Sequence, residues 1–322
     1  MQAEIPGQPR VAIVVPTYNR AGLVVRAIDS ALAQTYENLD VVVVDDGSTD
    51  DTWAVLQAYR PEPRVRLVRL DRNRGVTAAK NAGLDAIDGG TPYVGILDSD
   101  DTLTPDAIAA LVGVFQATGD RYSQVFGWCR DRVSGQPTGR MTHREGPITY
   151  DDALTGRFSG EFWQLARCDL IGGRRFDERA SGAESSVWWP LLKMHDGWLI
   201  SADVRSYDSS GEDRVSNIHY TQRDALGRMW ACQAALVAVG EDLRSRYPAL
   251  YGGRQAELAK WAAMAGQHSI ARRASRAALH AAPSPRSLAI VILCLVPAPI
   301  LRAVLGLRAS RSARRQREEL RP

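Results

Sequence analysis

The chain has 322 residues, of which 45% are hydrophobic, and a formal net charge of +3 at pH 7. This is enough apolar material for one large domain, or for a domain with an appendage. Residues 286–322 hold eight Arg and two Glu, for a net charge of +6, so the preceding 285 residues carry −3. The body of the protein is therefore not a basic nucleic-acid-binding surface, and we expect no nucleic acid partner.

The first half of the chain alternates strand and helix patterns. The patterns predict strands over 11–15, 39–44, 65–70 and 93–97, and helices over 21–34, 52–59 and 76–87. This order predicts an α/β fold with a mostly parallel central sheet and helices on both faces. Polar clusters follow three of the strands, at the sheet edge where open α/β sheets bind nucleotides.

The run 93–97 ends in three carboxylates, Asp98, Asp100 and Asp101, and Thr104-Pro105 predicts an N-cap and the first position of the next helix. Clustered carboxylates repel one another, whereas Mg²⁺ or Mn²⁺ gives a reason to gather them. The alternative is a solvated acidic turn.

The middle of the chain is less regular, and the last third is alanine-rich and helical. Strands are predicted over 124–129, 162–166 and 199–207, a brief helix over 150–155, a helix ending at His195, and helices over 221–282 with breaks near 247–248 and 252–253. We therefore expect an α/β domain over 8–215, a helical extension over 216–285 and a tail over 286–322.

The tail contains an uncharged run over 288–301 that is followed by arginines. Its fourteen residues, interrupted by Pro297 and Pro299, fall short of the about 20 that span a bilayer. The pattern favours an interfacial or re-entrant segment whose arginines contact an anionic membrane surface. The alternative is a helix packed on the domain with a solvated basic tail.

Scattered cysteines and the amino terminus indicate the compartment. The four cysteines have no paired spacing for zinc or redox chemistry, which suits a reducing environment: Cys129, Cys168, Cys232 and Cys294. The first ten residues lack the apolar core of a secretory signal. We expect a cytoplasmic protein, peripheral on the inner face of the cell membrane.

Three segments together resemble the signatures of family 2 glycosyltransferases in order and spacing. They are residues 15–20 (Val-Pro-Thr-Tyr-Asn-Arg), 44–52 (Val-Asp-Asp-Gly-Ser-Thr-Asp-Asp-Thr) and 97–101 (Leu-Asp-Ser-Asp-Asp). The similarity covers about residues 10–207 and is strongest up to residue 106. The resemblance implies a GT-A fold, a nucleotide-sugar donor, Mg²⁺ or Mn²⁺, and inversion at the anomeric centre.

The resemblance also implies roles for residues of the donor side. Pro16 and Tyr18 line the base pocket, and Asp46 accepts a hydrogen bond from the base ring N–H. Asp98 contacts the ribose hydroxyls or the metal's shell, and Asp100 ligates the metal that bridges the diphosphate.

Three basic residues are further candidates for nucleotide contacts. Arg74 and Lys80 are expected near the nucleotide, although the family position at Lys80 is commonly arginine. Arg214 stands where the family often has an Arg-x-His that contacts the diphosphate.

Inversion by a single displacement needs a base that takes the proton of the acceptor hydroxyl. Glu184, with Trp189 five residues later, resembles the family's base motif. The family usually has Glu-Asp here, but Ser185 follows Glu184, so one acid is left for the role. The alternative is a Glu that is favoured by the dipole at the start of a helix.

The predicted function is an inverting, metal-assisted glycosyltransferase of the hexosyltransferase kind. It would move a sugar from a UDP- or dTDP-sugar to a hydroxyl of a glycan or lipid-linked acceptor in cell-envelope polysaccharide biosynthesis. A second hypothesis is a catalytically lapsed nucleotide-sugar-binding protein, because the acceptor half departs from the family pattern at Ser185 and in the late loop around Arg214. A sugar-1-phosphate nucleotidyltransferase would need a glycine-rich, arginine-containing loop after the first strand, and the chain lacks one.

Overall fold

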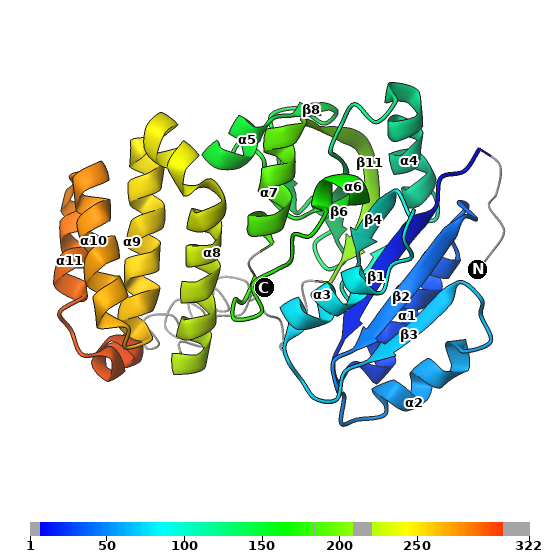
Figure 1. The fold of residues 1–322 in the computed structure, drawn as a ribbon, viewed down its shortest axis with the longest axis horizontal. Coiled ribbons are helices and arrows are strands. Elements are labelled where there is room, and N and C mark those ends of the chain that lie inside the picture. Colours follow the sequence, from blue (N-terminus) through cyan, green and yellow to red (C-terminus); the bar gives the residue numbers. More distant parts are fainter. Residues whose placement is uncertain (1–6, 183, 209–220, 305–322) are drawn as a thin grey trace, which may run out of the picture. The chain divides into compact units, whose positions relative to one another are not determined.

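A computed structural model describes residues 7–182, 184–208 and 221–304 (Figure 1). The chain divides into two compact units. The sheet unit comprises Met1–Glu178 and Val187–Gly211, and the helical unit comprises Arg179–Ser186 and Glu212–Pro322.

Within the described residues, a nine-stranded sheet has the order β3-β2-β1-β4-β10-β6-β11-β5, and β8 pairs with β11. Strands β3, β2, β1 and β4 run parallel, whereas β10 is antiparallel to both of its neighbours. The bounds of these strands are β1 Val11–Thr17, β2 Leu39–Asp45, β3 Val65–Arg69, β4 Tyr93–Ile96, β5 Thr102–Leu103, β6 Gln124–Asp131, β8 Gly146–Ile148, β10 Phe162–Arg167 and β11 Gly197–Tyr207.

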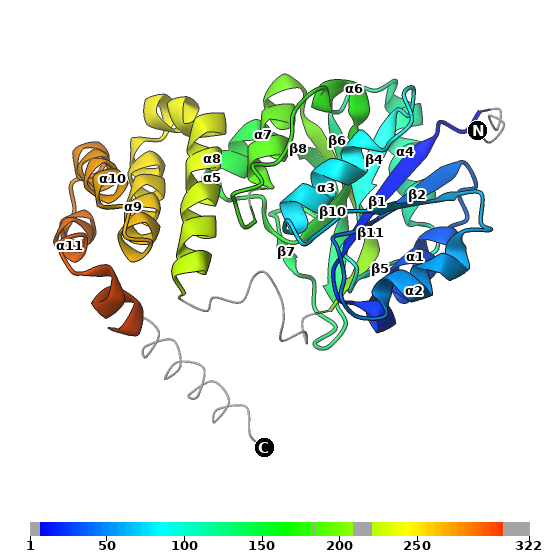
Figure 2. The same ribbon diagram turned by 60° about the horizontal axis from the view of Figure 1, so that its bottom comes forward.

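Helices cover both faces of the sheet (Figure 2). Alternate residues of β1 point to opposite faces, so Val11 and Ile13 pack with α1 and α4, while Ala12 and Val14 pack with α3, α6 and α7. The bounds of the helices in this part of the chain are α1 Ala21–Leu32, α2 Thr52–Leu56, η1 Gln57–Tyr59, α3 Val76–Asp85, α4 Ala107–Thr118, α5 Tyr150–Thr155, α6 Cys168–Ile171 and α7 Ser185–Met194. A separate two-stranded sheet pairs β7 (Gly139–Arg140) with β9 (Ser159–Gly160).

The described helices of the helical unit enclose an apolar core of their own, built largely from alanine, methionine and tryptophan side chains. They are α8 Gln222–Arg246, α9 Pro248–Met264, α10 His268–Ala281 and α11 Pro285–Leu293. No helix in the described part of the chain combines the length and hydropathy that crossing a bilayer requires.

Two local predictions were wrong. Asp106, not Thr104, precedes α4, because the Thr104 hydroxyl donates to the Asp203 carbonyl (3.1 Å), and Gln34 accepts the Ile108 N–H of the first turn (3.0 Å). Residues 252–253 lie inside α9 rather than at a break. The helix instead ends before Gly266, which has a φ of +78° that favours glycine.

Candidate functional site

Three polar loops meet at one edge of the sheet unit because the strands that precede them are adjacent and parallel. In the register of the sheet, Thr17 of β1 lies beside Asp45 of β2, and Val14 lies beside Ile96 of β4. The Asp46 N–H donates to the Thr17 carbonyl (2.9 Å), which continues the ladder into the loops. The predicted convergence of these strand ends is confirmed.

The loops after β1 and β2 are joined by side-chain hydrogen bonds. Asn19 adopts a positive φ of 50°, and its side-chain oxygen accepts the Thr49 N–H (2.9 Å) while its own N–H donates to the Ser48 hydroxyl (2.9 Å). The Arg20 N–H donates to the Thr52 hydroxyl (2.8 Å). Many polar groups of these two motifs therefore bind one another. The neighbouring Tyr18 is 37% exposed.

Gly47 is required by geometry in the second loop. Its φ is +68°, and a Cβ at this position would lie 2.6 Å from backbone atoms of Arg72. Both the left-handed backbone and the close approach exclude a side chain. The turn therefore brings Asp46 against the loop that precedes α3.

Asp46 is buried, and it holds that loop in place. Its two carboxylate oxygens accept the backbone N–H groups of Arg74 and Gly75, each at 2.8 Å. Burial raises the pKa of Asp46, and these two hydrogen bonds act in the opposite direction. A carboxylate has about four acceptor positions, so Asp46 keeps capacity for the predicted bond from a nucleotide base.

Each acid of the loop after β4 pairs with a basic side chain from a different element. The pairs are Asp98 with Lys80 of α3 (3.3 Å), Asp100 with Arg20 before α1 (3.2 Å), and Asp101 with Arg205 of β11 (3.2 Å). The loop is therefore held by ion pairs with residues that are distant in sequence, which a solvated surface turn would not need.

Of these pairs, Lys80 and Asp98 differ most in the exposure of their side chains. The Lys80 side chain is 6% exposed, whereas the Asp98 side chain is 42% exposed. Burial would raise the pKa of Asp98, but the positive charges of Lys80 and Arg205 outweigh it and hold that pKa below its usual value. Asp98 is therefore an ionised carboxylate at neutral pH that a ligand can reach.

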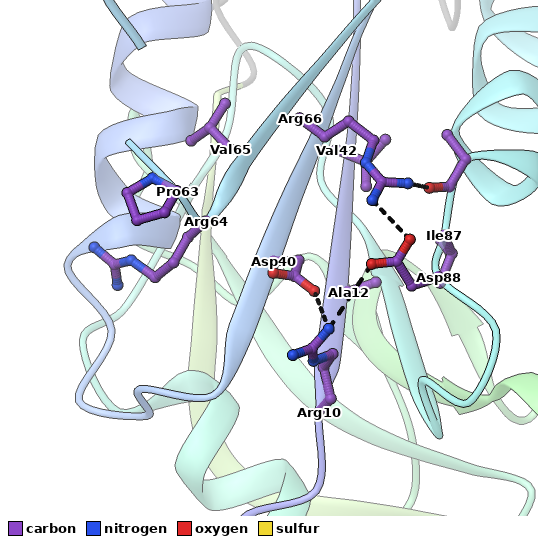
Figure 3. A pocket seen from close by; sticks show the side chains of 11 residues that line it. Arg10, Ala12, Asp40, Val42, Pro63, Arg64, Val65, Arg66, Ile87 and Asp88 are labelled. Carbon is purple, nitrogen blue, oxygen red and sulfur yellow. Dashed lines mark hydrogen bonds and ion pairs between the residues drawn. The ribbon is translucent and has the colours of Figure 1, made fainter. Parts of the chain in front are cut away.

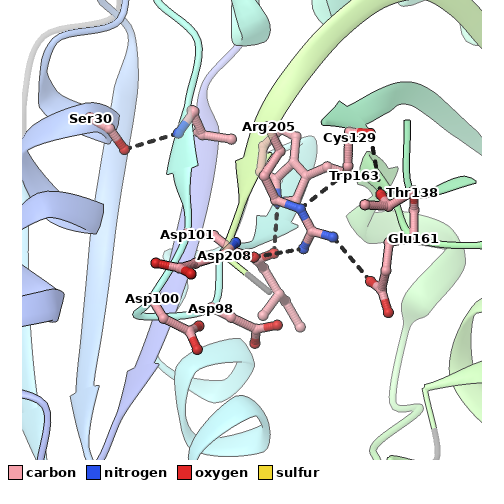
Figure 4. A network of polar contacts seen from close by, with 12 residues as sticks. Ser30, Asp98, Asp100, Asp101, Cys129, Thr138, Glu161, Trp163, Arg205 and Asp208 are labelled. Atoms are coloured by element: carbon pink, nitrogen blue, oxygen red, sulfur yellow. Dashed lines mark hydrogen bonds and ion pairs between the residues drawn. The ribbon is translucent and has the colours of Figure 1, made fainter. Parts of the chain in front are cut away.

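Asp101 belongs to a buried network centred on Arg205 (Figure 4). The Arg205 guanidinium contacts Asp101, donates to Glu161 (3.0 Å) and approaches the Cys129 sulfur (3.2 Å). The Asp208 N–H donates to the other oxygen of Asp101 (3.1 Å). Burial raises the pKa of Asp101 to about 7, against the lowering effect of Arg205. The sequence pattern did not indicate Arg205, because it lies about a hundred residues beyond the acidic loop.

Two carboxylates at this edge could contribute to a divalent cation site that substrate phosphates complete. No group of three or more His, Cys, Asp or Glu side chains in the described part of the chain is arranged to hold a metal. Mg²⁺, however, is usually bound by one or two carboxylates together with phosphates of the substrate. Asp98 is accessible. Asp100 pairs with Arg20 through Oδ2, so its other carboxylate oxygen takes no part in that ion pair. These two carboxylates are therefore suitable donors for a cation that a diphosphate completes.

The other predicted site residues lie in different surroundings. Pro16 is buried within β1. The Arg74 guanidinium pairs with Glu178 (2.7 Å). Glu184 is exposed, directly precedes α7 and belongs to the helical unit. Arg214 lies outside the described residues.

A pocket of about 180 Å³ lies elsewhere in the sheet unit (Figure 3). It is lined by the amino ends of β1, β2 and β3 and by the end of α3, so it is at the edge of the sheet opposite the polar loops. Arg10 lies there between Asp40 (3.6 Å) and Asp88 (3.8 Å), and Arg66 pairs with Asp88 (2.6 Å). These two arginines and two acids are paired with one another, and this pocket is not the candidate site.

Comparison with known proteins identifies the family. Residues 12–165 match the model of Glycosyl transferase family 2. The chain is also 32% identical over 214 residues to the GalNAc(5)-diNAcBac-PP-undecaprenol β-1,3-glucosyltransferase of Campylobacter jejuni, with 65% of this chain and 67% of that protein covered. The chain belongs to glycosyl transferase family 2. The resemblance carried by the three motifs is thereby confirmed.

Other relatives match shorter stretches. The succinoglycan biosynthesis protein ExoO of Rhizobium meliloti is 50% identical over 111 residues, which are 34% of this chain and 31% of that protein. The similarity to this protein is therefore restricted to a part of each chain.

Solved structures confirm the fold. The S. aureus TarS fragment 1–349, in complex with UDP-GlcNAc, has a TM-score of 0.61 at 17% identity, with 95% of this chain and 92% of that chain covered. The mannosyltransferase PcManGT of Pyrobaculum calidifontis, in complex with GDP-Man and Mn²⁺, has a TM-score of 0.55 at 22% identity, with coverages of 94% and 88%. The predicted GT-A type α/β fold with a helical extension is confirmed.

Proposed function

We propose that this family 2 glycosyltransferase moves a sugar from a nucleotide-diphosphate donor to an acceptor hydroxyl with inversion and with the help of Mg²⁺ or Mn²⁺. The observation that carries the proposal is the loop 98–101, whose carboxylates are gathered at the end of β4 and are each held by a cation from another element. Folding alone gives no reason to assemble such a cluster beside two further polar strand ends.

The donor would bind at the edge formed by these loops. Tyr18 offers an exposed ring for the base or ribose, and Asp46 offers acceptor capacity for a base N–H. Asp98 and Asp100 would hold the cation, which neutralises the charge that develops on the leaving diphosphate. Lys80 keeps Asp98 ionised, and Arg20 fixes the orientation of Asp100.

Glu184 would act as the general base. A carboxylate that takes the proton as the acceptor oxygen attacks makes that oxygen a better nucleophile. The support is the match of its motif to the family pattern and the exposure of the residue before α7.

The relatives suggest the substrate class. The C. jejuni protein is named for transfer to an undecaprenol-linked glycan, and another relative, TuaG of Bacillus subtilis, is a putative teichuronic acid biosynthesis glycosyltransferase. The TarS structure contains UDP-GlcNAc. We propose a UDP- or dTDP-sugar as the donor, and a glycan or lipid-linked acceptor of the cell envelope.

The carboxyl-terminal part would contact the inner face of the membrane. Residues 258–317 contain no Asp or Glu. Large apolar side chains of α11 and the following turn are exposed, including Leu288 (51%), Ile292 (58%) and Leu295 (75%). Apolar side chains combined with nearby arginines suit an anionic lipid surface. The arginines after residue 304 lie outside the described residues.

A thermal-shift screen of UDP, dTDP and GDP and their sugars, with and without Mn²⁺, tests the donor assignment, because a ligand that binds the native state raises the melting temperature. We expect a uridine or thymidine nucleotide to stabilise the protein more when Mn²⁺ is present. No stabilisation by any nucleotide would contradict the proposal. Nucleotide binding without transfer to any acceptor in a broad panel would instead favour the catalytically lapsed protein.

A further inference from the structure

Gly227 is an unexpected residue in the middle of an alanine-rich helix. It lies in the second turn of α8, where glycine stabilises a helix less than alanine does. A buried glycine within a helix usually has a packing reason. A Cβ at this position would lie 2.2 Å from the hydroxyl oxygen and 3.1 Å from the Cβ of Ser181. An alanine here would require the Ser181 hydroxyl to rotate away and the Ser181 Cβ to move by a few tenths of an ångström, so the glycine lets Ser181 lie close to the helix backbone.

Two further contacts join this segment to α8. The Ser181 N–H donates to the Gly227 carbonyl (3.1 Å), and the Arg179 guanidinium lies over the Trp230 ring, 3.8 Å from its centroid. Gly227 and Trp230 are three residues apart, so they lie on one face of the helix. All these residues belong to the helical unit, as do residues 179–186 as a whole.

The two ends of the segment are fixed independently in the sheet unit. The Asn81 side chain exchanges two hydrogen bonds with the backbone of Phe176, both at 2.9 Å, and Val187 packs in the core cluster of Val14 and Val42. Between these two positions, Arg179 and Ser181 are held by the contacts with α8, three to five residues before Glu184.

We propose that Gly227 and Trp230 are positioning residues for catalysis, because they hold the backbone of the segment that carries Glu184. This inference rests on the proposed function of Glu184 as the base.

The experiment compares Gly227→Ala with Gly253→Ala in the full chain. Gly253 lies inside α9 and a Cβ there would meet nothing within 4 Å, so its substitution controls for the change in helix propensity. Hydrogen–deuterium exchange of residues 179–187, in the absence of ligand, measures how firmly the backbone of this segment is held. UDP affinity measures donor binding. Release of the nucleoside diphosphate from a nucleotide sugar, with an acceptor present, measures sugar transfer.

We expect Gly227→Ala to accelerate exchange in residues 179–187 and to lower kcat by about 10- to 100-fold with unchanged UDP affinity, because small displacements of catalytic groups have effects of this size. Gly253→Ala should change neither. Adding Ser181→Gly removes the side chain that the new Cβ meets, and it should restore both exchange and kcat.

Unchanged exchange in Gly227→Ala, or faster exchange with wild-type kcat, would overturn the positioning role. Failure of Ser181→Gly to restore kcat would also contradict it. Glu184→Gln tests the role of Glu184 as the base separately from the positioning role of Gly227. If that variant retains wild-type kcat, the assignment of the base fails, whatever the result with Gly227→Ala.

Discussion

The acidic loop 98–101 and the carboxyl-terminal helices gather like charges in opposite ways. In the loop, three carboxylates face three cations that come from α3, from the residue before α1 and from β11. Residues 258–304 instead contain several arginines and no acid, and Arg272, Arg273 and Arg276 of α10 are exposed. We propose that the first cluster, which is held by internal partners, binds a ligand, and that the second, which has no acids near it in sequence, binds an external anionic surface.

The largest expected effect is the loss of kcat when Glu184, the proposed general base, is replaced. Glu184→Gln keeps the shape of the side chain but removes the proton acceptor, so we expect kcat to fall by about 10²- to 10⁴-fold with unchanged UDP affinity. Steady-state kinetics and calorimetry check this. A loss of UDP affinity equal to the loss of kcat would indicate a donor-binding role instead.

The buried basic partner of the loop 98–101, Arg205, should contribute strongly to the free energy of unfolding. Arg205→Met leaves Asp101 buried without its partner, and breaking such a pair costs about 3–5 kcal/mol. Arg130→Met is the matched control, because Arg130 also pairs with an acid, Asp203 at 2.6 Å, but its side chain is 45% exposed. Exposed pairs contribute about 0–1 kcal/mol. Equal losses of unfolding free energy in urea for the two variants would show that the buried pair contributes no more to stability than the exposed one.

The exposed apolar residues of the carboxyl-terminal part should matter for lipid binding. Replacing Ile292 and Leu295 by Ser should weaken sedimentation with phosphatidylglycerol vesicles about ten-fold or more, because each side chain contributes on the order of 1 kcal/mol when it is buried in lipid. Val237→Ser is the control, since Val237 of α8 is 84% exposed. Equal binding to phosphatidylcholine vesicles would contradict the role of anionic lipid.

A smaller effect is expected at the start of α5, where Thr149 and Asp152 form a reciprocal capping box. Burial would raise the pKa of Asp152, but its hydrogen bonds with Thr149 and its contact with Arg157 lower it. Because the folded-state pKa is the lower one, the stabilisation is present above about pH 4 and is lost as the pH falls through the folded-state value. Asp152→Asn should cost about 1 kcal/mol at pH 7. A double-mutant cycle with Thr149→Ala should show that the two losses do not add.

The sequence predicted the parts of the site that depend on local patterns. Buried runs such as 11–15 and 39–44 gave the strands, and the acids after them gave the loops. Arg205 was missed because a guanidinium in an alternating strand has no local mark, and its partner Asp101 lies 104 positions earlier. Gly227 was missed because a glycine is favoured there by the close approach of Ser181, which belongs to another segment of the chain. The structural role of Asp46 toward Arg74 and Gly75 was missed for the same reason, since a carboxylate after a strand has the same sequence whether it binds a ligand or a neighbouring loop.

The central claim is that the carboxylates after β4 hold a cation together with a nucleoside diphosphate. Calorimetric titration of UDP, with and without Mn²⁺, into the wild-type protein, Asp100→Asn and Asp106→Asn tests it most directly. Asp106 is the control, because it is an exposed acid before α4 with no assigned role in binding. We predict that Mn²⁺ strengthens UDP binding about ten-fold or more in the wild type and in Asp106→Asn but not in Asp100→Asn, since the metal binds through one or two carboxylates and the phosphates. UDP binding that is indifferent to Mn²⁺ in the wild type, or an undiminished Mn²⁺ effect in Asp100→Asn, would contradict the claim.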